Sequence, residues 1–280
     1  MATEALAIET YYPRPGLREL LDSKLGMSVP ERRRWRVSDF AALDQFHFAG
    51  LRATVELASL CELTPNSMVL DLGAGLGGPA RYLATAFDCS VEGIDLSADF
   101  VDAARYLTER VGLGNRVSFQ QGDACQIPFL ANYFDVVWTQ HVSMNIENRA
   151  QLYREVARVL HPGGRFAIFD PVGTDLGPPE FPVPWSRASA TSFLVTAEEM
   201  RNYLLADGLF EIVSWSDQTA DALVWAASQP APAGPSTAEP AVTLAHIIGP
   251  EAPVMLRNFT AGLKSGRLAL VQAVLRRTAK

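Results

Sequence analysis

The stretch Met68-Val-Leu-Asp-Leu-Gly-Ala-Gly-Leu-Gly-Gly78 decides the fold of this chain. Its first half is apolar apart from Asp71 and predicts a buried strand. Its second half holds three glycines in the spacing G-x-G-x-x-G, namely Gly73, Gly75 and Gly78. Pro79 comes next and suits the first turn of a helix. Such a turn joins a strand to a helix, and its glycines also let a ligand approach the main chain closely.

The chain beyond this stretch alternates between strands and helices. Strands are predicted at residues 90–95, 117–119, 134–138 and 165–170, and helices at 97–111 and 148–160. This alternation predicts an α/β fold, with a doubly wound parallel sheet and helices on both faces. The intervening segment 161–164, His-Pro-Gly-Gly, is expected to be a turn.

After residue 170 the regular alternation of strands and helices ends. Thr196 and Glu199 form a capping box that opens a helix to about residue 206. Further elements are a strand at 210–215, helices at 217–228 and 251–264, and an apolar strand at 268–275.

These elements divide the chain into a cap and a main domain. Residues 1–65 are too short to bury a core of their own and are expected to pack as a helical N-terminal cap. Residues 66–280 form the main domain, with insertions at 171–195 and 217–265.

Composition excludes several classes of function. A net charge of −7 over 280 residues argues against a nucleic-acid partner. No apolar run reaches the roughly 18–20 residues of a membrane span, and the N-terminal segment lacks a signal-peptide pattern. Three distant cysteines indicate free thiols in a reducing compartment, and neither cysteines nor histidines show metal-ligand spacing. We therefore expect a cytoplasmic protein without a metal site.

Acidic residues after successive strands bear on the ligand of the glycine turn. A dinucleotide would place its pyrophosphate on the helix N-terminus, where Asp71 would repel it. S-adenosylmethionine carries an ammonium and a sulfonium and no phosphate, so Asp71 favours it. Asp95 can accept hydrogen bonds from two ribose hydroxyls in either cofactor. Asp123 can accept from an adenine amino group, with Ala124 or Cys125 supplying a backbone amide to the ring. For Asp95 and Asp123, a helix-cap or turn role is the alternative.

Five motifs, taken in order, resemble the class I S-adenosylmethionine-dependent methyltransferases. They are Val69-Leu-Asp-Leu-Gly-Ala-Gly-Leu-Gly-Gly78, Gly93-Ile-Asp-Leu-Ser97, Gly122-Asp-Ala124, Phe134-Asp-Val-Val-Trp138 and Arg158-Val-Leu-His-Pro-Gly-Gly164. The resemblance implies a Rossmann-like sheet of seven strands, mostly parallel with an antiparallel last strand. It also implies that Asp71 and Gly73 hold the methionine end, Asp95 the ribose, and Asp123 and Ala124 the adenine. The other residues assigned to the cofactor site are Ala74, Gly75, Leu96 and Gln140.

Segments outside this core are similar to the bacterial sarcosine/dimethylglycine-type methyltransferases. They are Asp44-Gln-Phe-His47, Leu51-Arg-Ala-Thr54, Gly77-Gly-Pro-Ala-Arg81, His141-Val-Ser-Met-Asn145, Val183-Pro-Trp185 and Ser192-Phe-Leu194. This resemblance implies a small-molecule methyl acceptor.

Side chains near the expected strand ends are candidates for binding that acceptor. His141 is the candidate general base, because histidine titrates near neutral pH; an orienting or packing role is the alternative. Trp185 is expected either to shield a cation or to cover apolar surface. Arg187 is a candidate partner for a substrate carboxylate. The remaining candidates are Tyr11, Tyr12, Gln45, His47, Met144 and Asn145.

The sequence supports three functional hypotheses. The first is methyl transfer to the nitrogen of a small amine or amino acid, by in-line displacement. The second has the same donor but methylates a larger apolar or secondary-metabolite acceptor at carbon or oxygen. The third is a nucleotide-binding oxidoreductase or a non-catalytic cofactor-binding module. The identity of the acceptor, the need for a general base and the oligomeric state, a homo-oligomer included, stay open.

Overall fold

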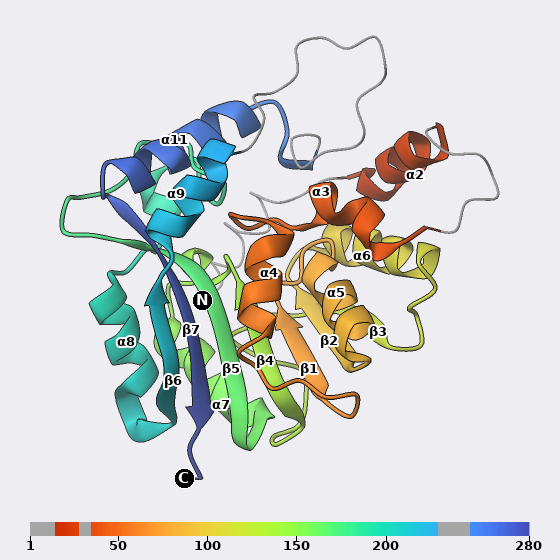
Figure 1. Ribbon diagram of the computed structural model, residues 1–280, viewed down its shortest axis with the longest axis horizontal. Coiled ribbons are helices and arrows are strands. Elements are labelled where there is room, and N and C mark those ends of the chain that lie inside the picture. Colours follow the sequence, from red (N-terminus) through yellow and green to blue (C-terminus); the bar gives the residue numbers. More distant parts are fainter. Residues whose placement is uncertain (1–14, 28–34, 229–246, 280) are drawn as a thin grey trace.

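A single sheet forms the centre of the fold (Figure 1). The computed structural model describes residues 15–27, 35–228 and 247–279. Within them, seven strands lie in the order β3-β2-β1-β4-β5-β7-β6. They are β1 (Met68–Leu72), β2 (Ser90–Asp95), β3 (Val117–Gln121), β4 (Phe134–Gln140), β5 (Leu160–Gly173), β6 (Phe210–Asp217) and β7 (Leu268–Arg277).

The last strand runs against its neighbours, as expected. Parallel pairing joins β3, β2, β1, β4 and β5, whereas β7 pairs antiparallel with both β5 and β6. The five residues from Val271 to Leu275 are all buried, which is typical of a strand inside a sheet and not of an edge. The predicted mostly parallel seven-stranded sheet with an antiparallel last strand is therefore confirmed.

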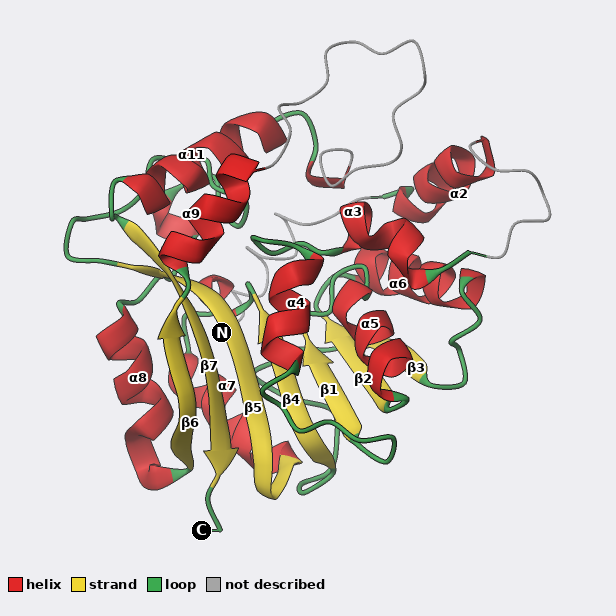
Figure 2. Ribbon diagram, in the orientation of Figure 1, coloured by secondary structure: helices red, strands yellow, loops and turns green. Residues whose placement is uncertain are grey.

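Helices cover both faces of the sheet (Figure 2). One face carries α4 (Leu51–Ala58), α5 (Gly78–Phe87) and α6 (Ala98–Arg110), and the other carries α7 (Arg149–Val159) and α8 (Ala197–Leu205). Because side chains alternate along a strand, Val69 of β1 packs into the first core while Leu70 and Leu72 pack into the second. The glycine turn therefore leaves the sheet between two hydrophobic layers.

Further helices stand over the carboxyl ends of the parallel strands (Figure 1). They are α2 (Leu17–Met27), α3 (Ala41–Asp44), α9 (Thr219–Ser228) and α11 (Ala252–Lys264). Leu21 of α2 packs with Leu107 of α6, and Phe259 of α11 joins the core that faces α4. Within the described ranges, every helix is too short or too polar to span a bilayer.

The predicted turn at 161–164 is wrong, because the structure includes these residues in β5. Pairing with β4 jumps from Phe134–Leu160 to Val136–Arg165, so the four residues between them bulge out of the ladder. Gly163 absorbs the bend with a φ of 85°. Local Pro and Gly residues indicate an interruption, but they do not reveal that the sheet continues on both sides of it.

Candidate functional site

A cavity opens at the carboxyl ends of the parallel strands, where open α/β sheets bind their ligands. Its volume is about 1180 Å³ when the open mouth is counted. Eleven of the predicted site residues line it: Gly73, Gly75, Asp95, Leu96, Asp123, Ala124, Gln140, His141, Met144, Asn145 and Trp185.

The glycine turn forms the floor of the cavity beside β1. Gly73 has a φ of 68°, and its backbone amide donates to the carbonyl oxygen of Ile94 at 2.8 Å. A Cβ atom at position 73 would lie 2.6 Å from Cγ2 of Val142. A side chain here would be strained and would clash, so the turn requires glycine where it meets the cavity.

Asp95 holds a carboxylate at the cavity wall, at the end of β2. Its Oδ2 accepts from the amide of Gly75 at 2.9 Å, and its Oδ1 accepts from the amide of Ser97 at 2.9 Å. Burial raises the pKa of Asp95, and the two amide hydrogen bonds oppose that rise. Each carboxylate oxygen can accept more than one hydrogen bond, so Asp95 keeps capacity for hydroxyl donors from a ligand.

Asp71 lies beneath the turn and does not line the cavity. Burial, and then the charge of Asp95, raise the pKa of Asp71 to about 8. Its Oδ2 has no hydrogen-bond partner among the described residues. A cation near this acid would lower its pKa again, because it would favour the charged form.

Asp123 and Ala124 line the far end of the same cavity. Oδ1 of Asp123 accepts from the amide of Cys125 at 2.7 Å, as in an Asx turn. Asp123 therefore has the turn role that the sequence offered as an alternative, and it also lines the cavity.

The segment after β4 supplies the centre of the site, and Asp170 of β5 anchors it. The buried carboxylate of Asp170 accepts from the amide of Val142 at 2.9 Å and from the amide of Ser143 at 3.3 Å. The hydroxyl of Ser143 also donates to it. These bonds fix the segment from which His141, Met144 and Asn145 reach the cavity.

His141 sits in an aromatic setting. Its ring centroid lies 5.4 Å from that of Phe169, 5.9 Å from that of Phe259 and 6.1 Å from that of His47. Burial, followed by the neighbouring His47, lowers the pKa of His141 well below its usual value, so the imidazole is neutral at pH 7. Its Nε2 atom is buried and has no partner among the described residues. A neutral ring with a free nitrogen is suited to accept a hydrogen bond or a proton.

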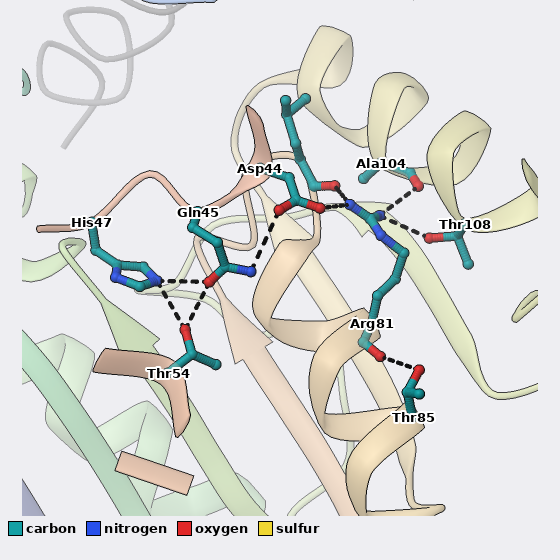
Figure 3. A network of polar contacts seen from close by, with 9 residues as sticks. Asp44, Gln45, His47, Thr54, Arg81, Thr85, Ala104 and Thr108 are labelled. Carbon is teal, nitrogen blue, oxygen red and sulfur yellow. Dashed lines mark hydrogen bonds and ion pairs between the residues drawn. The ribbon is translucent and has the colours of Figure 1, made fainter. Parts of the chain in front are cut away.

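A buried polar network joins Gln45, His47 and Thr54 (Figure 3). The Oγ1 atom of Thr54 lies 2.7 Å from Oε1 of Gln45, 3.0 Å from Nε2 of His47 and 3.1 Å from Oε1 of Gln140. Oε1 of Gln140 also accepts from the indole of Trp138 at 3.0 Å. With its oxygen held in this way, Gln140 retains an unpartnered Nε2 donor at the cavity wall.

Much of the cavity lining is apolar. Its walls include Phe46, Phe100, Met144, Trp185 and Ile247. The indole of Trp185 donates to Oγ of Ser192 at 3.0 Å, which satisfies its polar group and leaves the ring face for packing.

Of the predicted residues that the structure describes, five do not line the cavity. Gln45, His47, Asp71 and Ala74 are buried outside the lining, and Arg187 forms an ion pair with Glu251 at 2.8 Å, with both side chains about half exposed. Tyr11 and Tyr12 lie outside the described residues. The sequence interpretation missed Phe100 and Ile247, because helical periodicity assigned the former to a core and nothing local distinguishes the latter. It also missed Thr54 and Asp170, whose roles depend on contacts between distant segments.

The middle of the chain is similar to known methyltransferases. Residues 70–168 match the model of a methyltransferase domain family. The chain is 37% identical over 132 residues to Methyltransferase GfsG of Streptomyces halstedii, covering 47% of this chain and 48% of that protein. It is 36% identical over 126 residues to a sarcosine/dimethylglycine N-methyltransferase of Halorhodospira halochloris, covering 44% and 45%. The chain thus spans about half the length of these curated relatives.

A solved structure agrees over almost the whole chain. The geranyl diphosphate C-methyltransferase of Streptomyces coelicolor superposes with a TM-score of 0.71, covering 98% of both chains at 17% identity. At this identity the likeness concerns the fold. The sequence matches confirm the resemblance to S-adenosylmethionine-dependent methyltransferases, and it is residues 70–168 that are similar to a methyltransferase domain.

Proposed function

We propose that this protein binds S-adenosylmethionine in the cavity and transfers its methyl group to a small molecule. The observation that carries the proposal is the carboxylate of Asp95 at the end of β2, held by the amide of the glycine turn 2.9 Å away. This arrangement suits a ribose whose two hydroxyls need acceptors. Asp123 and Ala124 are the residues for the adenine, and Gly73 and Gly75 give the methionine end close access to the main chain. The bound cofactor supplies an electrophilic methyl group on a sulfonium.

A dinucleotide fits the described residues less well. Its pyrophosphate would need the N-terminus of α5. That space is taken, because a Cβ atom at Gly78 would lie 2.3 Å from the carbonyl oxygen of Asp44 and 2.6 Å from its Oδ1. In addition, no arginine or lysine lies among the described residues that line the cavity.

The lining also favours one class of acceptor. The charged side chains among the described lining residues are Asp95 and Asp123, both assigned to the cofactor. An amino-acid acceptor would bring a carboxylate, which is costly to bury without a cation. Arg187, the candidate partner for such a group, is paired with Glu251 outside the cavity. We therefore favour the second hypothesis, an uncharged and largely apolar acceptor that is methylated at oxygen or carbon.

The chain's own residues then have distinct tasks. Met144 and Trp185, which are 3% and 2% exposed, exclude water from the acceptor end and limit the directions from which the nucleophile approaches. With an acceptor hydroxyl in the cavity, Nε2 of His141 would take the proton that this oxygen loses. Its lowered pKa keeps it unprotonated at pH 7 but makes it a weak base.

Transfer of a radiolabelled methyl group tests the proposal. The acceptor panel contains hydroxylated apolar molecules (polyketides, terpenoids, phenols) and the amines glycine, sarcosine and dimethylglycine. We expect label in a member of the first group and none in the second. Label in sarcosine alone would contradict the acceptor class while leaving the methyl donor intact. The Asp95→Ala variant serves as the control for background transfer.

A further inference from the structure

Four residues of the N-terminal cap lie directly across the glycine turn. We call Asp44-Gln45-Phe46-His47 the strap. Phe46 of the strap lines the cavity, and its ring centroid lies 5.6 Å from that of Phe100. A Cβ atom at Gly75 would lie 3.0 Å from Cδ2 of Phe46. The strap therefore closes the cavity beside the turn proposed to hold the cofactor.

A buried ion pair ties the strap to the main domain (Figure 3). Nη2 of Arg81, on α5, lies 2.7 Å from Oδ2 of Asp44, and the two side chains are 0% and 1% exposed. The same Nη2 donates to the carbonyl oxygen of Leu76 in the turn at 2.7 Å. Nη1 donates to Oγ1 of Thr108 in α6 at 3.0 Å. One guanidinium thus joins the strap, the glycine turn and a third helix.

The absence of a side chain at Gly78 lets the strap approach α5 closely. The carbonyl oxygen of Asp44 and the side-chain nitrogen Nε2 of Gln45 occupy the space that a side chain at Gly78 would need, because a Cβ atom there would lie 2.3 Å and 2.6 Å from them. A buried ion pair is often no more stabilising than apolar residues of the same volume, because both charges lose their hydration. The best-attested use of buried polar or ionic groups is to select one packing arrangement of neighbouring segments over others.

We propose that Asp44 and Arg81 are positioning residues of the cofactor site. Their ion pair locks the strap against the N-terminal turn of α5, and this lock places Phe46 as a wall of the cofactor cavity. Without the pair the strap lifts, the cavity opens to water at that wall, and the cofactor loses contacts. The inference rests on the proposed function, because it assigns the wall to a cofactor.

Hydrogen exchange of the ligand-free protein tests the lock. In Asp44→Asn the backbone amides of residues 45–50 are expected to exchange faster than in the wild type, while those of β4 are unchanged. The matched control is Asp88→Asn, which breaks an ion pair with Arg116 at a site where Asp88 is 65% exposed. It should leave exchange in the strap unchanged. Equal strap protection in Asp44→Asn and the wild type would overturn the lock.

Binding of S-adenosylhomocysteine tests the positioning role. Asp44→Asn and Phe46→Ala are each expected to weaken binding about tenfold. If the ion pair acts through Phe46, the double variant binds within about twofold of the weaker single variant, because the two changes remove the same wall. Additive losses, or an unchanged dissociation constant in a folded Asp44→Asn, would overturn the proposal.

A second variant and the exchange experiment separate a failure of the lock from a failure of the proposed function. If Asp44→Asn does not fold, Gly78→Ala replaces it, since the added methyl pushes the strap away without removing a charge, and the same losses are expected. If the wild type binds no S-adenosylhomocysteine, the proposed function fails and the cofactor role of the wall fails with it. The exchange experiment would still decide whether the pair holds the strap.

Discussion

At the scale of single residues, burial sets the charge of the site's histidines. His47 is 7% exposed, and burial lowers its pKa from 6.5 to about 4. Between these values the unfolded chain binds a proton that the folded chain does not, so stability is lost as the pH falls from 6.5 towards 4. His141, whose pKa is also lowered, contributes in the same direction.

The replacement His47→Gln should therefore flatten the pH dependence of stability. Between pH 7 and pH 4.5 the wild type is expected to lose about 2 kcal/mol more free energy of unfolding than the variant. Urea unfolding at both pH values measures this difference. His161→Gln, at an exposed position, is the control and should follow the wild type. Equal pH slopes in wild type and His47→Gln would show that His47 is not held neutral by burial.

His141 carries the prediction that concerns catalysis. For an acceptor that must lose a proton, His141→Ala should lower turnover at least about tenfold, the lower part of the range for general acid–base catalysis. The dissociation constant of S-adenosylhomocysteine should change less, because the ring is assigned to the acceptor end. Steady-state rates across pH 6–9 measure the effect. A rate equal to that of the wild type at every pH would remove His141 from the mechanism.

At the scale of secondary-structure elements, α8 offers a test away from the site. Thr196 accepts from the amide of Glu199 at 3.2 Å, and the carboxylate of Glu199 accepts from the amide of Thr196 at 2.7 Å. Removing the cap by Thr196→Ala should cost about 1 kcal/mol of stability. Chemical unfolding should show this loss, while S-adenosylhomocysteine binding stays as in the wild type. A weakened ligand affinity would mean that general destabilisation reaches the cavity, and the strap variants would then need reinterpretation.

Elements defined by local signals were predictable from the sequence. The capping box at Thr196 and the glycine turn after β1 each depend on residues within one or two turns of chain, so their spacing suffices. The shared location of the acids that end β2 and follow β3 was also predictable, because parallel strands bring their carboxyl ends to one edge of the sheet. Asp95 and Asp123 accordingly line one cavity.

The apolar walls of the cavity could not be predicted in the same way. Phe46, Phe100, Trp185 and Ile247 come from four distant segments and meet only when the helices over the strand ends are packed. Apolar residues at these positions have the same local pattern whether they line a cavity or fill a core. The lock between Asp44 and Arg81 was missed for the same reason, since 37 residues separate its partners.

At the scale of the whole molecule, the fold depends on its last strand. β7 pairs with β5 from Arg165 to Gly173 and with β6 from Phe210 to Asp217, so it joins β6 to the rest of the sheet. Deletion of residues 268–280 should abolish cooperative unfolding and the near-ultraviolet circular dichroism of the packed core. Deletion of residues 279–280 alone is the control and should leave both intact. A cooperative transition in the longer deletion would contradict this dependence.

The central claim is that the strand-end cavity binds a sulfonium nucleoside, and calorimetry with S-adenosylhomocysteine tests it most directly. We predict one binding site in the wild type. Asp95→Ala should weaken binding at least about tenfold, because hydrogen bonds to a charged group contribute roughly 1.5–3 kcal/mol each. Glu211→Ala, at a half-exposed residue of β6, should bind as the wild type does. No heat with S-adenosylhomocysteine, together with binding of a nicotinamide dinucleotide, would contradict the account.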